Sequence, residues 1–152
     1  MFKTEYIESF AEFYAEAKPH FEDHYNTCEY HRAGKQKLDL DLELFQQMID
    51  LGAMNIFVLK DDEDIVGYIN VSITPSPLFR TPQAVVDFLY ILPEHREKGY
   101  TKKAIQEIEK ELISQRVFDF NILLPEKDYS EEVAKSLGFK KTSNTYTKIL
   151  GE

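Results

Sequence analysis

One stretch of the chain, residues 84–113, constrains the fold more than any other. Residues 84–92 are apolar except for Asp87 and predict a buried strand, which runs into a basic turn around Gly99 and then into an amphipathic helix over about 100–113. A strand that turns through a glycine into a helix exposes the first helical N–H groups, which have no partner inside the helix and carry partial positive charge. The sequence therefore predicts a site for an anion such as phosphate where this strand meets this helix.

Charge is unevenly distributed, in a way that favours an anionic ligand at this turn. The chain has 18 basic and 27 acidic residues, a net charge of −9; residues 1–64 contain 15 acidic and 6 basic residues, and residues 65–152 contain 12 of each. Against the single acid Glu97, the turn gathers four cations: Arg96, Lys98, Lys102 and Lys103. The acidic half would face a neutral or cationic partner, or would serve only to keep the protein soluble. Four cations against this net charge argue against a nucleic-acid partner.

Length and composition indicate a single globular domain over residues 1–152. Apolar residues make up 43% and charged residues 30% of the chain, which is ordinary for a soluble protein. No apolar run approaches the roughly 18–20 residues that span a bilayer, and no secretion signal is evident, so no membrane partner is expected. Cys28 is the only cysteine, which excludes an internal disulfide, favours a cytoplasmic location and leaves no thiolate-rich metal motif.

Apolar spacing and turn residues along the rest of the chain indicate alternating helices and strands. Helices are expected over 6–17, closed by Pro19, and over 38–51, closed by Gly52. Residues 20–37 between them are polar and are expected to form a loop, with or without a short helix. Strands are expected over 56–59 and 65–73, joined by the acidic residues 61–64 and followed by an irregular connection over 74–83. A further strand is expected over 118–124. The chain would end with a helix, capped by Ser130 and ended by Gly138, and a closing hairpin of residues 139–142 and 146–150. This order predicts an α/β (α+β) fold with helices on both faces of a mixed sheet.

Several motifs, taken in order, resemble those of the GNAT superfamily of N-acetyltransferases, which transfer an acyl group from coenzyme A to an amine. The apolar strand that runs into Pro93 and Arg96, the Arg96-x-x-Gly99 spacing, the Ile-Val-Gly-Tyr run at 65–68 and the Leu-Gly-Phe run at 137–139 carry the resemblance. It covers roughly residues 54–150. Small members with a similarly polar first loop occur in bacteria and their phages, which suggests such a source.

The resemblance implies a mostly antiparallel sheet with a V-shaped splay between its fourth and fifth strands, acetyl-coenzyme A as co-substrate, no metal, and dimers as a common assembly. The backbone of residues 97–102 would cradle the pyrophosphate, and the main chain of residues 89–91 would pair with the pantetheine arm. The cofactor-binding residues implied are Leu89, Ile91, Arg96, Glu97, Lys98, Gly99, Tyr100, Thr101 and Lys102. Thr101 stands where the family usually has glycine or alanine.

The catalytic residues are less clearly indicated. Asp87 is the first candidate for the base, because a carboxylate in an apolar strand gains proton affinity on burial; a solvent-facing or hydrogen-bonded aspartate is the alternative. The family often has a tyrosine as the acid where this chain has Ala134, so Tyr129 and then Tyr146 are the nearest substitutes. Both could instead be packing or surface residues.

The acceptor substrate is indicated only by a cluster in the first polar loop. His20, Glu22 and His24 fall in the loop that covers substrate in this family, although a solvated loop would look the same. We therefore expect an acetyl group to move from acetyl-coenzyme A to a primary amine, of a small molecule or a protein lysine, by direct attack in a ternary complex. The alternative is a weak or inactive GNAT-fold protein that binds acyl-coenzyme A or a protein partner, which Ala134 and Thr101 favour.

Overall fold

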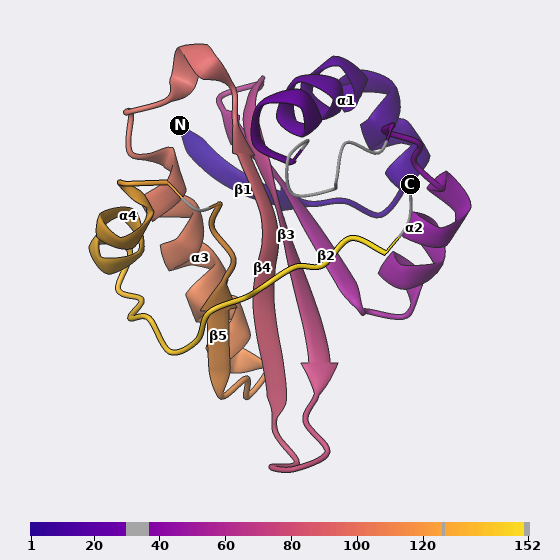
Figure 1. The fold of residues 1–152 in the computed structure, drawn as a ribbon. Helices are drawn as coiled ribbons and strands as arrows, with labels where there is room; N and C mark the ends of the chain where they lie inside the picture. The colour runs from indigo at the N-terminus through magenta and orange to yellow at the C-terminus, as the bar shows by residue number, and fades with distance from the viewer. Residues whose placement is uncertain (30–36, 126, 151–152) are drawn as a thin grey trace.

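The computed structural model describes residues 1–29, 37–125 and 127–150, and its centre is one five-stranded sheet in the order β1-β2-β3-β4-β5 (Figure 1). Neighbouring strands are antiparallel except β4 and β5, which are parallel. The strands are β1 (Phe2–Tyr6), β2 (Met54–Asp61), β3 (Asp64–Pro75), β4 (Pro82–Ile91) and β5 (Asp119–Ile122). The helices are α1 (Phe10–His24), α2 (Leu42–Asp50), α3 (Tyr100–Ser114) and α4 (Ser130–Ser136), with a π-helical turn over Tyr25–Glu29 and a 3-10 turn over Pro93–His95. The mixed, mostly antiparallel sheet is confirmed.

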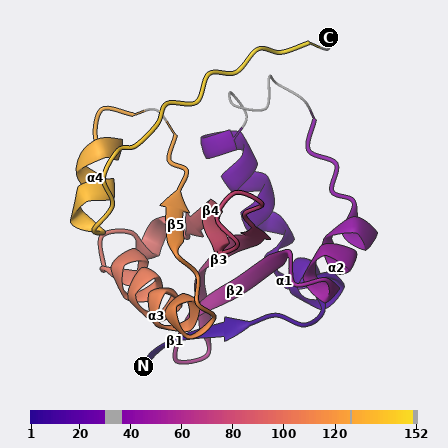
Figure 2. The ribbon, with the colours of Figure 1, turned by 90° about the horizontal axis from the view of Figure 1, so that it is seen from below.

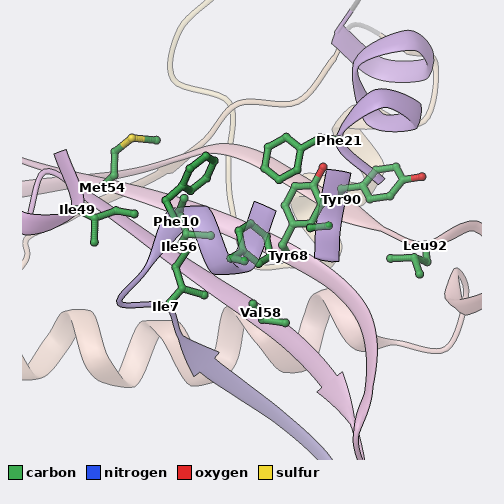
Figure 3. Packing of buried hydrophobic residues seen from close by; sticks show 12 residues of the cluster. Ile7, Phe10, Phe21, Ile49, Met54, Ile56, Val58, Tyr68, Tyr90 and Leu92 are labelled. Carbon is green, nitrogen blue, oxygen red and sulfur yellow. The ribbon is translucent and has the colours of Figure 1, made fainter. Parts of the chain in front are cut away.

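Helices cover both faces of the sheet, as predicted, and each face has its own core (Figure 2). On one face α1 and α2 pack on the sheet around the fully buried Phe10 and Tyr68, in the aromatic cluster of Figure 3. On the other face α3 points its apolar stripe inward, through Ala104, Ile105, Ile108 and Leu112. The sheet thus separates two hydrophobic cores, and each of its faces can bind a different ligand.

The prediction of a first helix over 6–17 was wrong at both ends. Residues 2–6 form the edge strand β1, and the helix begins at Phe10, where the Ser9 side chain accepts the N–H of Glu12. Pro19 does not close the helix, which continues through residues 20–24 that were predicted as loop. Burial of Phe21 and His24 in the last turns offsets the missing Pro19 donor. The rest of that predicted loop lies in the π-helical turn and partly outside the described residues.

Because Pro19 is exposed inside α1, Pro19→Ala should stabilise the protein. The alanine restores one helical N–H donor and relieves the proline ring against the preceding turn, for an expected gain of about 1 kcal/mol in the free energy of unfolding. Thermal unfolding should then shift upward by about 2–4 °C. Pro77→Ala, in the exposed turn between β3 and β4, is the control and should give no gain; an unchanged or lower midpoint for Pro19→Ala would count against the argument.

Other elements differ from the predictions in extent. The second helix is shorter than 38–51, because Asp41 caps it by accepting the N–H of Leu44 at 2.9 Å, while Gly52 follows its end as expected. Both predicted hairpin strands are present, and the irregular connection shrinks to residues 76–81 because Pro75 pairs with Pro82.

The end of the chain departs furthest from prediction. Ser130 is the first residue of α4 rather than its cap, since its hydroxyl donates to the Pro125 carbonyl at 2.5 Å. The closing hairpin was wrong: residues 139–150 contain no strand, and Tyr146 and Leu150 are both 88% exposed. Most residues of this segment are polar, so it has little apolar surface to bury. No helix in the described part of the chain is long and apolar enough to cross a membrane.

Candidate functional site

A β-bulge in β4 places Asp87 out of register with its neighbouring strand. On β3, Asn70 lies opposite Phe88 and Val71 lies opposite Val86, so Asp87 is the extra residue. The bulge changes which face each side chain occupies: Val86 packs in the core against α3, whereas Phe88 packs in the core against α1. Asp87 contacts side chains on the same face as Phe88, which is the face that α1 and α2 cover.

The sheet opens at the same point. β5 pairs with β4 only over residues 83–86, and the last backbone bond runs from Leu123 N to Val86 O at 3.0 Å. β4 continues to Ile91 without a described strand on its outer side. The expected splay between the fourth and fifth strands therefore begins where Asp87 stands. A free stretch of β4 main chain leads from there to the glycine turn.

The Asp87 carboxylate is half-buried and held by two neutral donors from β3. Asn70 donates Nδ2 to Oδ1 at 2.5 Å, and Ser72 donates its hydroxyl to Oδ2 at 2.6 Å. Within the described residues no cationic side chain pairs with it. Each oxygen therefore keeps a lone pair for an incoming proton, without a fixed positive charge to oppose its transfer.

The turn between β4 and α3 has the backbone of an anion cradle. Glu97 and Gly99 both have left-handed φ angles, 67° and 76°, and the first helical bond of α3 runs from Lys103 N to Gly99 O. The N–H groups of residues 100–102 precede that bond and so have no acceptor within the helix. A Cβ added at Gly99 would meet nothing within 4 Å, so the turn is open where a ligand would approach.

The cations of this turn are not equally available. Arg96 donates Nε to the Ile91 carbonyl at 3.0 Å, and its guanidinium lies 5.6 Å from the centre of the Tyr90 ring. Lys103 lies over the rings of Phe2 and Tyr100, at 5.8 and 5.7 Å. Lys98, whose Nζ lies 3.3 Å from His95 Nδ1, and Lys102 are exposed and remain the side chains best placed to meet an anion at the turn. Thr101 is half-buried, and the side chains of Leu89 and Ile91 pack toward α3.

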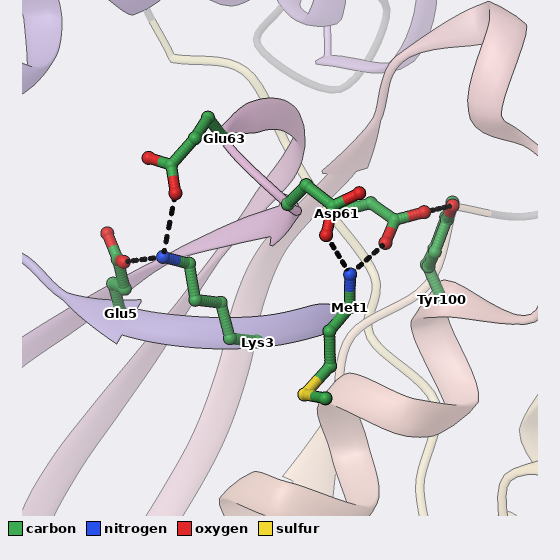
Figure 4. Close-up of polar contacts among 7 residues, drawn as sticks. Met1, Lys3, Glu5, Asp61, Glu63 and Tyr100 are labelled. Carbon is green, nitrogen blue, oxygen red and sulfur yellow. Dashed lines mark hydrogen bonds and ion pairs between the residues drawn. The ribbon is translucent and has the colours of Figure 1, made fainter.

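Tyr100 anchors the start of α3 instead of facing the turn. Its buried ring stacks on Phe2, and its hydroxyl donates to Asp61 at 2.6 Å, beside the contact of the Met1 amino group with Asp61 and Asp62 (Figure 4). This hydrogen bond is the largest cause that holds the pKa of Asp61 below its usual range and raises the pKa of Tyr100. The ionised carboxylate and the neutral phenol are thus the forms that the fold favours.

Tyr100→Phe should therefore lower stability in a pH-dependent way. A carboxyl whose folded pKa is depressed adds stability above its unfolded pKa and loses it as the pH falls through the folded value. We expect the difference in thermal midpoint between wild type and Tyr100→Phe to be largest at neutral pH and to become smaller below about pH 4. Melting curves at stepped pH values would show this, with Tyr129→Phe, an exposed tyrosine, as control. A gap that does not change with pH would contradict the assignment to Asp61.

The three predicted acceptor residues lie on α1 and do not form one cluster. His24 is buried, with Nδ1 2.9 Å from the Tyr68 hydroxyl and its ring stacked on Tyr90. His20, four residues earlier, shares its side of the helix and is half-buried, whereas Glu22 points away and is exposed. Between them Asp23, which the sequence did not indicate, accepts the Tyr90 hydroxyl.

The two candidate acids are both exposed. Tyr129 immediately precedes α4 and is 61% exposed, and Tyr146 lies in the C-terminal segment without strand structure. Neither contacts Asp87 in the described structure. Asn70 and Ser72 were missed by the sequence reasoning, although a lone asparagine between Ile69 and Val71 in an apolar strand is a signal that could have found Asn70.

Comparisons with known proteins agree with this geometry. A family model described as "Acetyltransferase (GNAT) family" matches residues 10–139. No match was found among curated proteins. An aminoglycoside acetyltransferase from an uncultured soil metagenomic sample, solved with sisomicin, has a TM-score of 0.79 at 17% identity, over 99% of this chain and 97% of that one.

Two further solved structures share the fold. A ribosomal-protein-alanine N-acetyltransferase from Brucella melitensis biovar Abortus 2308 has a TM-score of 0.76 at 14% identity, over 99% of this chain and 100% of that one. A predicted acetyltransferase from Clostridium acetobutylicum, solved with acetyl-CoA, has a TM-score of 0.69 at 12% identity, over 99% of this chain and 97% of that one. At such identities the likeness concerns the fold alone.

Proposed function

The chain belongs to the GNAT family of acetyltransferases, an acyltransferase family that uses acetyl-coenzyme A, and on that basis we propose that it transfers an acetyl group directly to a primary amine in a ternary complex. The observation that carries the proposal is Asp87, a bulged carboxylate at the point where β4 and β5 part. It faces the side of the sheet under α1 and α2, and the free β4 main chain leads from it to the glycine turn. Acceptor amine and coenzyme could therefore meet beside it from two directions.

The residues present fit the coenzyme. The N–H groups of residues 97–102, with Lys98 and Lys102 exposed beside them, would hold a diphosphate, and the open side of Gly99 leaves room for it. The main chain of residues 89–91 would pair with the extended arm as an added strand. Bound there, acetyl-coenzyme A supplies the acetyl group as a thioester at the splay.

Asp87 would act as the base. A primary amine attacks only as the neutral species, so its proton must leave, and an Asp87 oxygen with a free lone pair can accept it directly or through a water. The departing thiolate needs a proton in turn. Tyr129 and Tyr146 stay candidates for that acid, and both would have to approach the splay from exposed positions.

The acceptor is best sought among cationic amines. Residues 1–64, which include α1 and α2 over the Asp87 face, carry all of the excess acidic charge. Acids and aromatic faces attract ammonium groups, and on this face Phe88 is partly exposed, whereas Tyr68 and Tyr90 are buried. Solved structures of this fold include an aminoglycoside acetyltransferase and a ribosomal-protein-alanine acetyltransferase, so both small amines and protein amines belong in a test panel.

The test is thiol release from acetyl-coenzyme A with a panel of small amines, aminoglycosides and lysine peptides. We expect amine-dependent release with at least one class and acetylated amine as product by mass spectrometry. A second candidate, a fold that binds acyl-coenzyme A without turnover, is favoured by Ala134, which has no hydroxyl, and by Thr101 in the turn. Thermal stabilisation by acetyl-coenzyme A without thiol release for any amine would support this second candidate and contradict the first.

Replacing Gly99 should weaken coenzyme binding by more than the strain of its left-handed backbone can explain. Gly99→Ala places a side chain in a left-handed position, with a loss of about 1–2 kcal/mol in stability, and brings a methyl group toward the bound diphosphate. We expect acetyl-coenzyme A to bind about tenfold more weakly by calorimetry, since close backbone approach is lost. Gly52→Ala is the matched control, with φ 72° and equally open space; it should lose similar stability and bind normally. Equal affinities for the two variants would argue against the turn as the diphosphate site.

A further inference from the structure

Asn70 is a polar side chain where the fold would be expected to place an apolar one. It lies in the middle of β3, is fully buried, and stands between Ile69 and Val71, which both pack in the core against α3. Burial of an amide is unfavourable unless all its polar atoms are paired. Its Oδ1 is buried and has no hydrogen-bond partner among the described residues. A buried acceptor left unpaired in this way requires an explanation.

The nitrogen of the Asn70 amide explains why its oxygen is unpaired. Nδ2 donates to Asp87 Oδ1 at 2.5 Å and lies 3.3 Å from the Ser72 hydroxyl oxygen. An ionised carboxylate only accepts hydrogen bonds, so the amide must turn its nitrogen toward Asp87 and its oxygen away. The unpaired Oδ1 is the consequence of giving the carboxylate a donor.

Ser72 completes the arrangement. It lies two residues after Asn70, on the same face of β3, and donates to the second carboxylate oxygen at 2.6 Å. The bulge that shifts Asp87 out of register lets one side chain meet both partners. With one donor on each oxygen, the plane and direction of the carboxylate are fixed.

We infer that Asn70 and Ser72 are positioning residues that orient the Asp87 carboxylate for proton transfer. The inference rests on the proposed function, in which Asp87 accepts the amine proton. In that step the N–H bond of the amine breaks and an O–H bond forms on Asp87. The amine nitrogen bonds to the acetyl carbon, and the thiolate leaves with the electron pair of the carbon–sulfur bond. Loss of either donor lets the carboxylate rotate, so that its oxygens meet the amine proton less often in the productive geometry.

Other titratable groups on this face have partners of their own. His24 from α1 meets Tyr68 from β3, and Asp23 from α1 accepts the Tyr90 hydroxyl from β4. From β5, Asp119 meets Gln83 at the far end of the β4 pairing. None of them contacts Asp87 in the described structure. A loss of kcat caused by Asn70 or Ser72 substitution is therefore attributable to Asp87.

The experiment compares Asn70→Leu, Ser72→Ala and Asp87→Asn for amine acetylation at neutral pH. For Asn70→Leu and Ser72→Ala we expect kcat to fall about tenfold or more. KM for acetyl-coenzyme A should stay the same. Asn70→Leu removes the unpaired Oδ1 together with the donor to Asp87, so its thermal midpoint should change little, and a merely structural role would not combine an unchanged midpoint with lost kcat.

Asn55→Leu, on the adjacent strand β2 and hydrogen-bonded to backbone carbonyls only, is the matched control and should keep the wild-type kcat. If Asp87→Asn is inactive while both β3 variants keep wild-type kcat, the positioning role is wrong. If Asp87→Asn keeps full activity, the proposed base is wrong instead. Should Asn70→Leu fail to fold, Ser72→Ala alone decides between these outcomes through its kcat at unchanged KM.

Discussion

Asp87→Asn is expected to lower kcat for amine acetylation by about 10²–10⁴-fold, the range in which general bases contribute. Asparagine matches the shape of aspartate, but its amide cannot accept a proton at neutral pH. It also turns one N–H group toward the donors of Asn70 and Ser72, so one of these bonds is lost. Acetyl-coenzyme A affinity should be unchanged, because the proposed diphosphate site lies in the turn at residues 97–102. Steady-state kinetics and calorimetry together separate these effects.

The control for this variant is Asp119→Asn, which changes an aspartate on β5 whose contact is Gln83, three residues before the β4–β5 pairing ends. It should retain near wild-type kcat. If Asp87→Asn keeps kcat within about threefold of wild type, the amine proton leaves by another route and Asp87 has a structural role only.

The part of the fold that local pattern determines was predictable. The strand, glycine turn and helix over 84–113 could be predicted because the apolar run, Gly99 and the stripe of Ala104, Ile105 and Ile108 are all local signals. The acidic turn between β2 and β3 was visible for the same reason. Pro19 misled because its local effect is real but smaller than the burial of Phe21 and His24, which only the tertiary structure shows.

The candidate site was only half predictable, because its catalytic half depends on register. Asp87 could be noticed as a charge in an apolar strand, yet nothing in the sequence states that Val71 pairs with Val86 and Asn70 with Phe88. That one-residue shift decides that Asp87 meets Asn70 and Ser72 rather than the core under α3. Likewise, His24 and Tyr90 are 66 positions apart, and their stacking follows from how α1 packs on the sheet.

Gly67→Ala should be among the most destabilising single substitutions in the chain. Gly67 on β3 lies opposite Ile91 at the end of β4, and a Cβ built on it would stand 2.3 Å from the Tyr90 carbonyl oxygen and 2.9 Å from Ile91 Cδ1. Since one of these neighbours is backbone, no side-chain rotation removes the clash, and the two strands must move apart. We expect a loss of about 2–4 kcal/mol in the free energy of unfolding, or about 4–16 °C in thermal midpoint.

Moving β3 and β4 apart at Gly67 would also disturb both the acceptor face and the coenzyme turn. Tyr90 stacks on His24 of α1, and the Ile91 carbonyl accepts Arg96 Nε. A shift at residues 90–91 therefore moves the acceptor face and the glycine turn together. Gly67→Ala should therefore bind acetyl-coenzyme A more weakly even at temperatures where it is fully folded. Gly138→Ala, which has a left-handed φ of 91° and open space, controls for ordinary glycine loss and should lose about 1–2 kcal/mol with normal coenzyme binding. Chemical denaturation measures the free energy of unfolding of both variants. If Gly67→Ala loses no more than Gly138→Ala, close contact between β3 and β4 at Gly67 does not constrain the fold. The turn that follows β4 is then positioned by α3 alone.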